Sequence, residues 1–149
     1  MIEQTYARNI RTVILGDKIH IEEFAAVTRY GANVEFSDAY IQRVKASRQL
    51  VDQWIEEGRV MYGINTGFGA LYTHVISTEE TAQLQKNIIL SHATSVGTPL
   101  SIEEARAVIL MILQHAGQGY SGIRIETLEM YRQFLNLGLT PFAPKEGSV

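Results

Sequence analysis

The chain has 149 residues, of which 46% are hydrophobic and only 19% are charged. This balance excludes an intrinsically disordered protein. Thirteen Lys and Arg side chains stand against sixteen Asp and Glu, so the net charge of −3 offers no basic surface for a nucleic-acid partner. The charged fraction is below the roughly 25% of an ordinary soluble domain. We therefore expect other polypeptide to cover part of this chain's surface.

The chain contains no cysteine, which excludes disulfides, thiolate nucleophiles and cysteine-based zinc sites. None of its four histidines lies three or four residues from another, so the sequence predicts no metal site. The polar N-terminal segment 1–12 does not resemble a secretory signal, and the longest aliphatic run, 107–113, is too short to span a bilayer. We expect a cytoplasmic protein with no membrane partner and no internal domain boundary.

The sequence pattern predicts a mainly α chain with a small β element near its start. Residues 12–15 and 19–21 are rich in β-branched side chains and flank a Gly-Asp turn, a pattern typical of a β-hairpin. A good helix N-cap, Ser37, and a terminal glycine, Gly58, bracket a long stretch with helical spacing of apolar residues. We therefore predict, in order, a helix over 22–30, a strand over 34–36 and a helix from Ser37 to Glu57.

The C-terminal half predicts three further helices. Two begin at a capping box, Ser77 with Glu80 and Ser101 with Glu104, and the third runs over 125–137. The helix that follows Ser101 carries apolar residues on most of its sides. Such a helix is normally buried, and we expect a larger bundle or partner subunits to cover it.

A glycine-rich stretch at 62–69 is the most unusual segment of the chain. It fits neither a phosphate-binding loop nor a dinucleotide fingerprint, because no Lys-Ser or Lys-Thr follows and the glycine spacing is wrong. Two interpretations stay open: a structural turn with a buried tyrosine, or a functional loop. His92, in a predicted helix, is likewise either a hydrogen-bonded core residue or a ligand contact.

Four blocks, taken in order and with their spacing, resemble the aromatic amino acid lyase family, and most closely its histidine-acting members. These blocks are Met-Tyr-Gly-Ile-Asn-Thr-Gly-Phe-Gly at 61–69, Gln-Leu-Gln-Lys-Asn-Ile-Ile-Leu-Ser-His-Ala at 83–93, Gly-Tyr-Ser-Gly-Ile-Arg at 119–124 and Pro-Phe-Ala-Pro-Lys-Glu-Gly-Ser-Val at 141–149. The resemblance covers nearly the whole chain from Val13, but only the first third or less of a family member. It implies that residues 1–149 are the N-terminal part of a helical bundle of the fumarase/aspartase-like superfamily.

The resemblance also implies a chemistry. Family members form a methylidene-imidazolone electrophile autocatalytically from an internal Ala-Ser-Gly, with no metal, and the tripeptide is expected just after Val149. The implied reaction eliminates ammonia from L-histidine to give urocanate, a step of histidine breakdown, and the family's active sites form between subunits of a homotetramer. Tyr62 matches the family's general base. A phenol with an ordinary pKa near 10 is a poor base at neutral pH, so the complete site must stabilise its phenolate.

Substrate-binding residues are implied by the same matches. Ser91 and His92 stand where the family sets its substrate choice, and Gly69 brings backbone close to the substrate. An imidazole at His92 can exchange a hydrogen bond with an imidazole substrate. Enzymatic alternatives are a phenylalanine or tyrosine ammonia-lyase or a 2,3-aminomutase. A non-catalytic alternative is a fragment or degenerate paralogue that acts as an assembly partner, since the chain itself holds no Ala-Ser-Gly.

Overall fold

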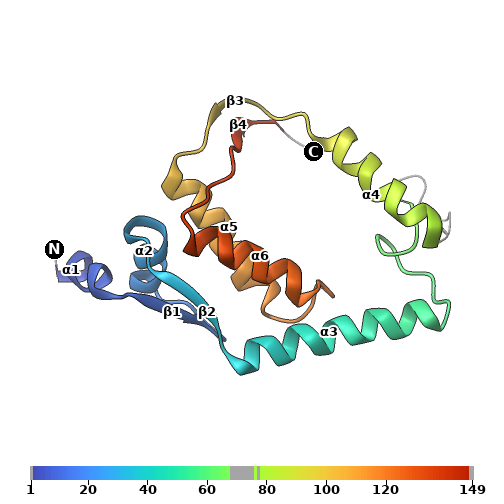
Figure 1. Ribbon diagram of the computed structural model, residues 1–149, viewed down its shortest axis with the longest axis horizontal. Helices are drawn as coiled ribbons and strands as arrows, with labels where there is room; N and C mark the ends of the chain where they lie inside the picture. The colour runs from blue at the N-terminus through green and yellow to red at the C-terminus, as the bar shows by residue number, and fades with distance from the viewer. Residues whose placement is uncertain (1, 68–75, 77, 148–149) are drawn as a thin grey trace. The chain divides into compact units, whose positions relative to one another are not determined.

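The computed structural model describes residues 2–67, 76 and 78–147 (Figure 1). Their elements, in chain order, are α1 (Ile2–Asn9), β1 (Thr12–Leu15), α2 (Ile21–Tyr30), β2 (Asn33–Phe36), α3 (Asp38–Glu56), α4 (Thr78–His92), β3 (Val96–Pro99), α5 (Ile102–Ala116), α6 (Ile125–Asn136) and β4 (Pro144–Glu146). The fold is mainly α, as predicted. Two compact units divide the chain: Met1–Leu50 with Pro99–Ala143, and Val51–Thr98 with Pro144–Val149.

The small β element of the first unit is a parallel pair, and the predicted hairpin is wrong. β1 pairs with β2 in the register Val13 to Val34, and α2 makes the crossover between them. Residues 19–20 precede a helix instead of forming a strand, because the Glu23 carboxylate accepts a hydrogen bond from the His20 backbone N–H at 2.8 Å. That bond satisfies a backbone donor near the helix start. Of the predicted 19–21 strand, only Ile21 belongs to α2, as its first residue.

Helix boundaries follow the predicted signals closely. α2 ends at Gly31 in a left-handed conformation with φ of 71°, and α3 begins after Ser37, whose hydroxyl accepts from the Tyr40 N–H at 3.2 Å. The predicted capping box of Ser101 and Glu104 is present at the start of α5. The other predicted box begins at Ser77, which lies outside the described residues. The sequence patterns did not predict α1 or the pairing of β3 with β4.

The core of the first unit forms where α5 packs against α2 and α6, with the β1–β2 pair beside them (Figure 1). Tyr40 is fully buried there; its ring stacks on Phe36 with centroids 4.3 Å apart, and its hydroxyl donates to the Leu113 carbonyl at 2.8 Å. Burial raises the pKa of Tyr40 above its ordinary value, so it stays a neutral donor. The other buried core residues are Val13, Leu15, Ala26, Val27, Ala32, Val34, Val44, Ile109, Leu110, Leu113, Ala116, Leu128 and Leu135.

We predict that Gly117→Ala destabilises the first unit by about 2 kcal/mol or more, because overpacking a core forces its side chains to shift. A Cβ at Gly117 would lie 1.9 Å from the Tyr40 ring. The free energy of unfolding from urea titration measures the effect. Gly16→Ala is the matched control, since its Cβ meets only the Ser37 hydroxyl at 3.5 Å. Equal stability of the two variants would contradict the prediction.

Candidate active site

The glycine-rich loop of the second unit is held by two polar side chains inside it. The Asn65 amide oxygen accepts from the Met61 N–H at 2.8 Å, and its NH₂ group donates to the Arg59 carbonyl at 2.7 Å. The buried Thr66 hydroxyl accepts from the Gly63 N–H at 3.3 Å and donates to the Gly67 carbonyl at 3.0 Å. Asparagine and threonine commonly stabilise turns in this way. The described part of the loop is therefore an internally bonded turn.

Tyr62 lies on this turn with 65% of its surface exposed. The interpretation as a turn with a buried tyrosine is therefore wrong, since Tyr62 is exposed while Thr66 is buried. The turn thus presents an accessible phenol beside the positive-φ glycine Gly63, whose φ is 75°. Gly69, predicted to approach the substrate, lies outside the described residues.

Ser91 and His92 end α4 on the exposed surface of the same unit. Their side chains are in direct contact, with 2.8 Å between the Ser91 Oγ and the His92 Nδ1. Both also reach the Ile88 carbonyl, at 3.0 Å from each atom. The interpretation of His92 as a hydrogen-bonded core residue is therefore wrong, because its side chain is exposed. The side chain is nevertheless hydrogen-bonded. The other ring nitrogen of His92, Nε2, forms no hydrogen bond with any of the described residues.

Close behind His92 the chain forms β3, which pairs with β4 from the C-terminal end. Gly147, directly after β4, comes so close to Ser95 that a Cβ on the glycine would lie 2.8 Å from the Ser95 Cα. Its φ of 131° is also one that residues with a side chain rarely adopt. Gly147, the last described residue, is therefore held beside Ser95, which follows His92 by three residues. Ser95 was not among the predicted site residues, and its close approach to Gly147 is visible only in the structure.

The second unit thus carries an exposed phenol on the turn before α4, and an imidazole with a hydroxyl at the end of α4. No contact joins Tyr62 to Ser91 or His92 among the described residues, but the three groups are suited to proton transfer and to hydrogen bonding with a small polar ligand. Among residues 2–67, 76 and 78–147, no group of three or more His, Asp or Glu side chains is arranged to hold a metal ion. Within the same described ranges, no helix combines the length and apolar character needed to cross a membrane.

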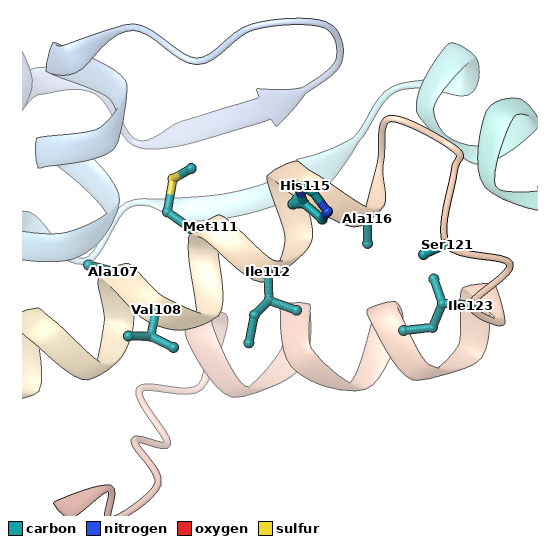
Figure 2. A pocket seen from close by; sticks show the side chains of 8 residues that line it. All are labelled: Ala107, Val108, Met111, Ile112, His115, Ala116, Ser121 and Ile123. Atoms are coloured by element: carbon teal, nitrogen blue, oxygen red, sulfur yellow. The ribbon is translucent and has the colours of Figure 1, made fainter. Parts of the chain in front are cut away.

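A second feature, in the first unit, is an apolar recess of 670 Å³ along α5. Figure 2 shows Val108, Met111 and Ile112 projecting from α5, and Ile123 on the loop that follows this helix. Among the described residues, the polar side chains that line the recess are those of His115 and Ser121, too few to form the convergent polar groups of a catalytic site. The sequence predicted a helix apolar on most sides, and the structure divides it into a buried face and this exposed one.

The model of the family described as aromatic amino acid lyase matches residues 19–149. This chain belongs to the aromatic amino acid lyase family. The histidine ammonia-lyase of Symbiobacterium thermophilum is 45% identical over 140 residues, which are 94% of this chain and 28% of that enzyme. The chain thus spans little more than a quarter of the length of this curated relative.

Solved structures support the same lyase family and its helical, fumarase-like fold. Ergothionase from Treponema denticola, described as an ergothioneine-degrading enzyme, matches with a TM-score of 0.87 at 32% identity, covering 93% of this chain and 28% of that one. Tyrosine aminomutase from Streptomyces globisporus matches with a TM-score of 0.85 at 30% identity, covering 92% of this chain and 26% of that one. The predicted family and fold class are therefore confirmed.

We predict that Gly147→Ala opens the β3–β4 pair of this lyase-family chain. Amide hydrogen exchange over 96–99 and 144–146 is expected to accelerate, because the new methyl group would displace the backbone at Ser95. Gly58→Ala is the control: it also sits at positive φ, 70°, but nothing lies within 4 Å of its Cβ. Unchanged exchange over β3 in Gly147→Ala would contradict the prediction.

Proposed function

We propose that residues 1–149 are the N-terminal part of an ammonia-lyase that converts L-histidine into urocanate and ammonia. One observation carries the proposal. The β3–β4 pair holds the segment leading to the expected Ala-Ser-Gly beside the residues that follow Ser91 and His92. An electrophile formed just after Val149 would therefore arise close in space to the proposed substrate-binding histidine, although it is distant in sequence. The 45% identity to a histidine ammonia-lyase supports the same reaction.

The methylidene-imidazolone, formed autocatalytically from the Ala-Ser-Gly, supplies an electrophile for the substrate amine, and no metal is required. Elimination removes a proton from Cβ and breaks the Cα–N bond, leaving a carbon–carbon double bond. Tyr62 is the general base for that proton in our proposal. Its exposed position on an internally bonded turn supports this role, because the phenol is accessible from the surface of the unit. Cationic groups or directed N–H groups elsewhere in the complete enzyme stabilise the phenolate.

The imidazole of His92 recognises the side chain of the substrate, and Ser91 assists it. A hydrogen bond between two imidazoles discriminates strongly, because an apolar analogue leaves the protein's polar group unpaired. Gly69 completes the substrate contacts by bringing its backbone close to the ligand. The short distance between Ser91 Oγ and His92 Nδ1 supports a joint role for these two side chains.

The complete enzyme is, in this proposal, a cytoplasmic homotetramer whose active sites need the remaining polypeptide. The exposed apolar face of α5 supports this, since Val108, Met111 and Ile112 would be covered by that polypeptide. The low charged fraction of 19% fits a chain with much of its surface buried in an assembly. The first 149 residues are then inactive by themselves, because they hold no Ala-Ser-Gly.

An aminomutase is the second candidate, favoured by the structural match to tyrosine aminomutase. The two activities are separated by their products: a lyase releases ammonia and an α,β-unsaturated acid, whereas an aminomutase returns a β-amino acid. A panel of L-histidine, L-tyrosine and L-phenylalanine with product analysis distinguishes them, and also identifies a phenylalanine or tyrosine lyase. If the coding sequence stops after Val149 and no complementary chain exists, the non-catalytic alternative is correct.

We predict that Tyr62→Phe in the complete enzyme lowers the rate of urocanate formation at least 100-fold, the lower limit typical of a lost general base. Urocanate absorbance measures the rate. The control is Tyr6→Phe, a tyrosine of matching exposure, 64%, that precedes the family match at 19–149. Equal rates for the Tyr62→Phe and unaltered enzymes would remove Tyr62 from the base role.

We predict that the isolated chain self-associates through α5, and that Val108→Lys reduces this association. The reason is that a lysine would place a charge in an apolar contact surface. Light scattering over a concentration series measures the mean mass. Leu50→Lys is the control, because Leu50 has nearly the same exposure, 49% against 50% for Val108, but lies on α3. A monodisperse, stable monomer of the unaltered chain would contradict the prediction.

A further inference from the structure

Three polar groups at the end of α4 form a closed triangle of hydrogen-bond distances. His92 Nδ1 lies 2.8 Å from Ser91 Oγ and 3.0 Å from the Ile88 carbonyl oxygen. Ser91 Oγ lies 3.0 Å from the same carbonyl oxygen. A carbonyl oxygen only accepts hydrogen bonds, a hydroxyl has one proton to donate, and a neutral imidazole carries its proton on one nitrogen alone. The positions of the protons are therefore constrained.

For the neutral imidazole, only one arrangement makes all three contacts attractive. If Nδ1 lacked a proton, its lone pair would face the lone pairs of the Ile88 carbonyl at 3.0 Å, and the single Ser91 proton could satisfy only one of its two neighbours. If Nδ1 carries the proton, it donates toward the Ile88 carbonyl and the Ser91 oxygen, while the Ser91 hydroxyl donates to the carbonyl. The second ring nitrogen, Nε2, is then left with a lone pair.

We propose that the Ile88 carbonyl and the Ser91 hydroxyl hold His92 as its Nδ1–H tautomer, so that Nε2 accepts a hydrogen bond from the substrate side chain. This inference rests on the proposed function as far as the substrate is concerned. It narrows the substrate class to amino acids whose side chain offers an N–H or O–H donor. Histidine and tyrosine meet that requirement, whereas phenylalanine and ring analogues that only accept do not.

Ser91 is a positioning residue in this scheme, because it acts through His92. Without its hydroxyl, the Ile88 carbonyl still accepts the Nδ1 proton, but one of the two acceptors facing Nδ1 is lost. The ring then samples the other tautomer and other orientations. Ser91→Thr keeps the hydroxyl, and we expect it to restore the behaviour of the unaltered protein.

The tautomer itself is tested on residues 1–149, independently of any activity. In the chain labelled with ¹⁵N-histidine, long-range ¹H–¹⁵N correlation assigns each ring nitrogen as pyrrole-type or pyridine-type, and His92→Gln identifies the His92 signals by their loss. We expect a pyrrole-type Nδ1 and a pyridine-type Nε2. Ser91→Ala should move the ¹⁵N chemical shifts of the two His92 ring nitrogens toward each other, because the two tautomers then interconvert. Ser91→Thr should leave these shifts unchanged. The opposite tautomer, or two pyrrole-type nitrogens at neutral pH, would overturn the proposal.

The consequence for substrates is tested in the complete enzyme with L-histidine, L-phenylalanine and the acceptor-only analogue 3-(4-pyridyl)-L-alanine. We expect L-histidine to be preferred over both others. Ser91→Ala should raise KM for L-histidine about three- to tenfold, the worth of one hydrogen bond, with kcat within about twofold. Gln83→Ala is the control, since it removes an exposed hydrogen bond to Asn87 on the same helix.

The outcomes separate the two proposals. Preference for pyridylalanine over L-histidine would overturn the acceptor role of Nε2 while leaving an ammonia-lyase in place. Failure to release ammonia from any amino acid would refute the proposed function, while the ¹⁵N shifts would still decide the tautomer. A KM change in Gln83→Ala equal to that in Ser91→Ala would assign the effect to α4 stability and remove Ser91 from its positioning role.

Discussion

The first unit depends on one buried cation. Arg106, only 7% exposed, lies in α5 and donates from Nε to the Val27 carbonyl at 2.9 Å and from Nη1 to the Leu135 carbonyl at 2.9 Å. These carbonyls belong to the last turns of α2 and α6, where helix dipoles favour a positive charge. Burial lowers the pKa of Arg106, but a guanidinium stays charged in proteins. One side chain thereby joins the three helices that enclose the core.

The return of the chain is the second constraint on which the candidate site depends. The chain leaves β3, forms α5 and α6 in the first unit, and comes back as β4 to pair with the strand it left. Gly147 then passes Ser95 at a distance that no side chain would allow. A segment about fifty residues away in sequence is thus brought beside the residues that follow His92. The proposed electrophile and the proposed substrate contacts share this local framework.

The side chains of Tyr62, Ser91 and His92 are exposed, and hydrogen bonds between residues close in sequence hold the segments that carry them. Asn65 and Thr66 shape the turn that presents Tyr62, and the Ile88 carbonyl contacts both Ser91 and His92. Local bonding of this kind sets orientation without requiring a closed pocket. The apolar face of α5 differs from these groups, because its side chains remain exposed and lack packing partners within the described residues.

The sequence by itself determined the family and most of the helix boundaries, and it supplied the candidate residues of the site. Capping signals such as Ser101 with Glu104 and terminal glycines such as Gly31 act within a few residues, so local patterns predicted them. Tertiary structure decided the partner of β1, the exposure of Tyr62 and the pairing of β3 with β4. Strand partners and burial depend on residues distant in the chain. β1 pairs with β2 and not with the β-branched segment 19–21, which lies at the start of α2. The proposed proton position on His92 depends on near neighbours, Ile88 and Ser91, but only the folded helix brings their oxygens within hydrogen-bond distance of the ring.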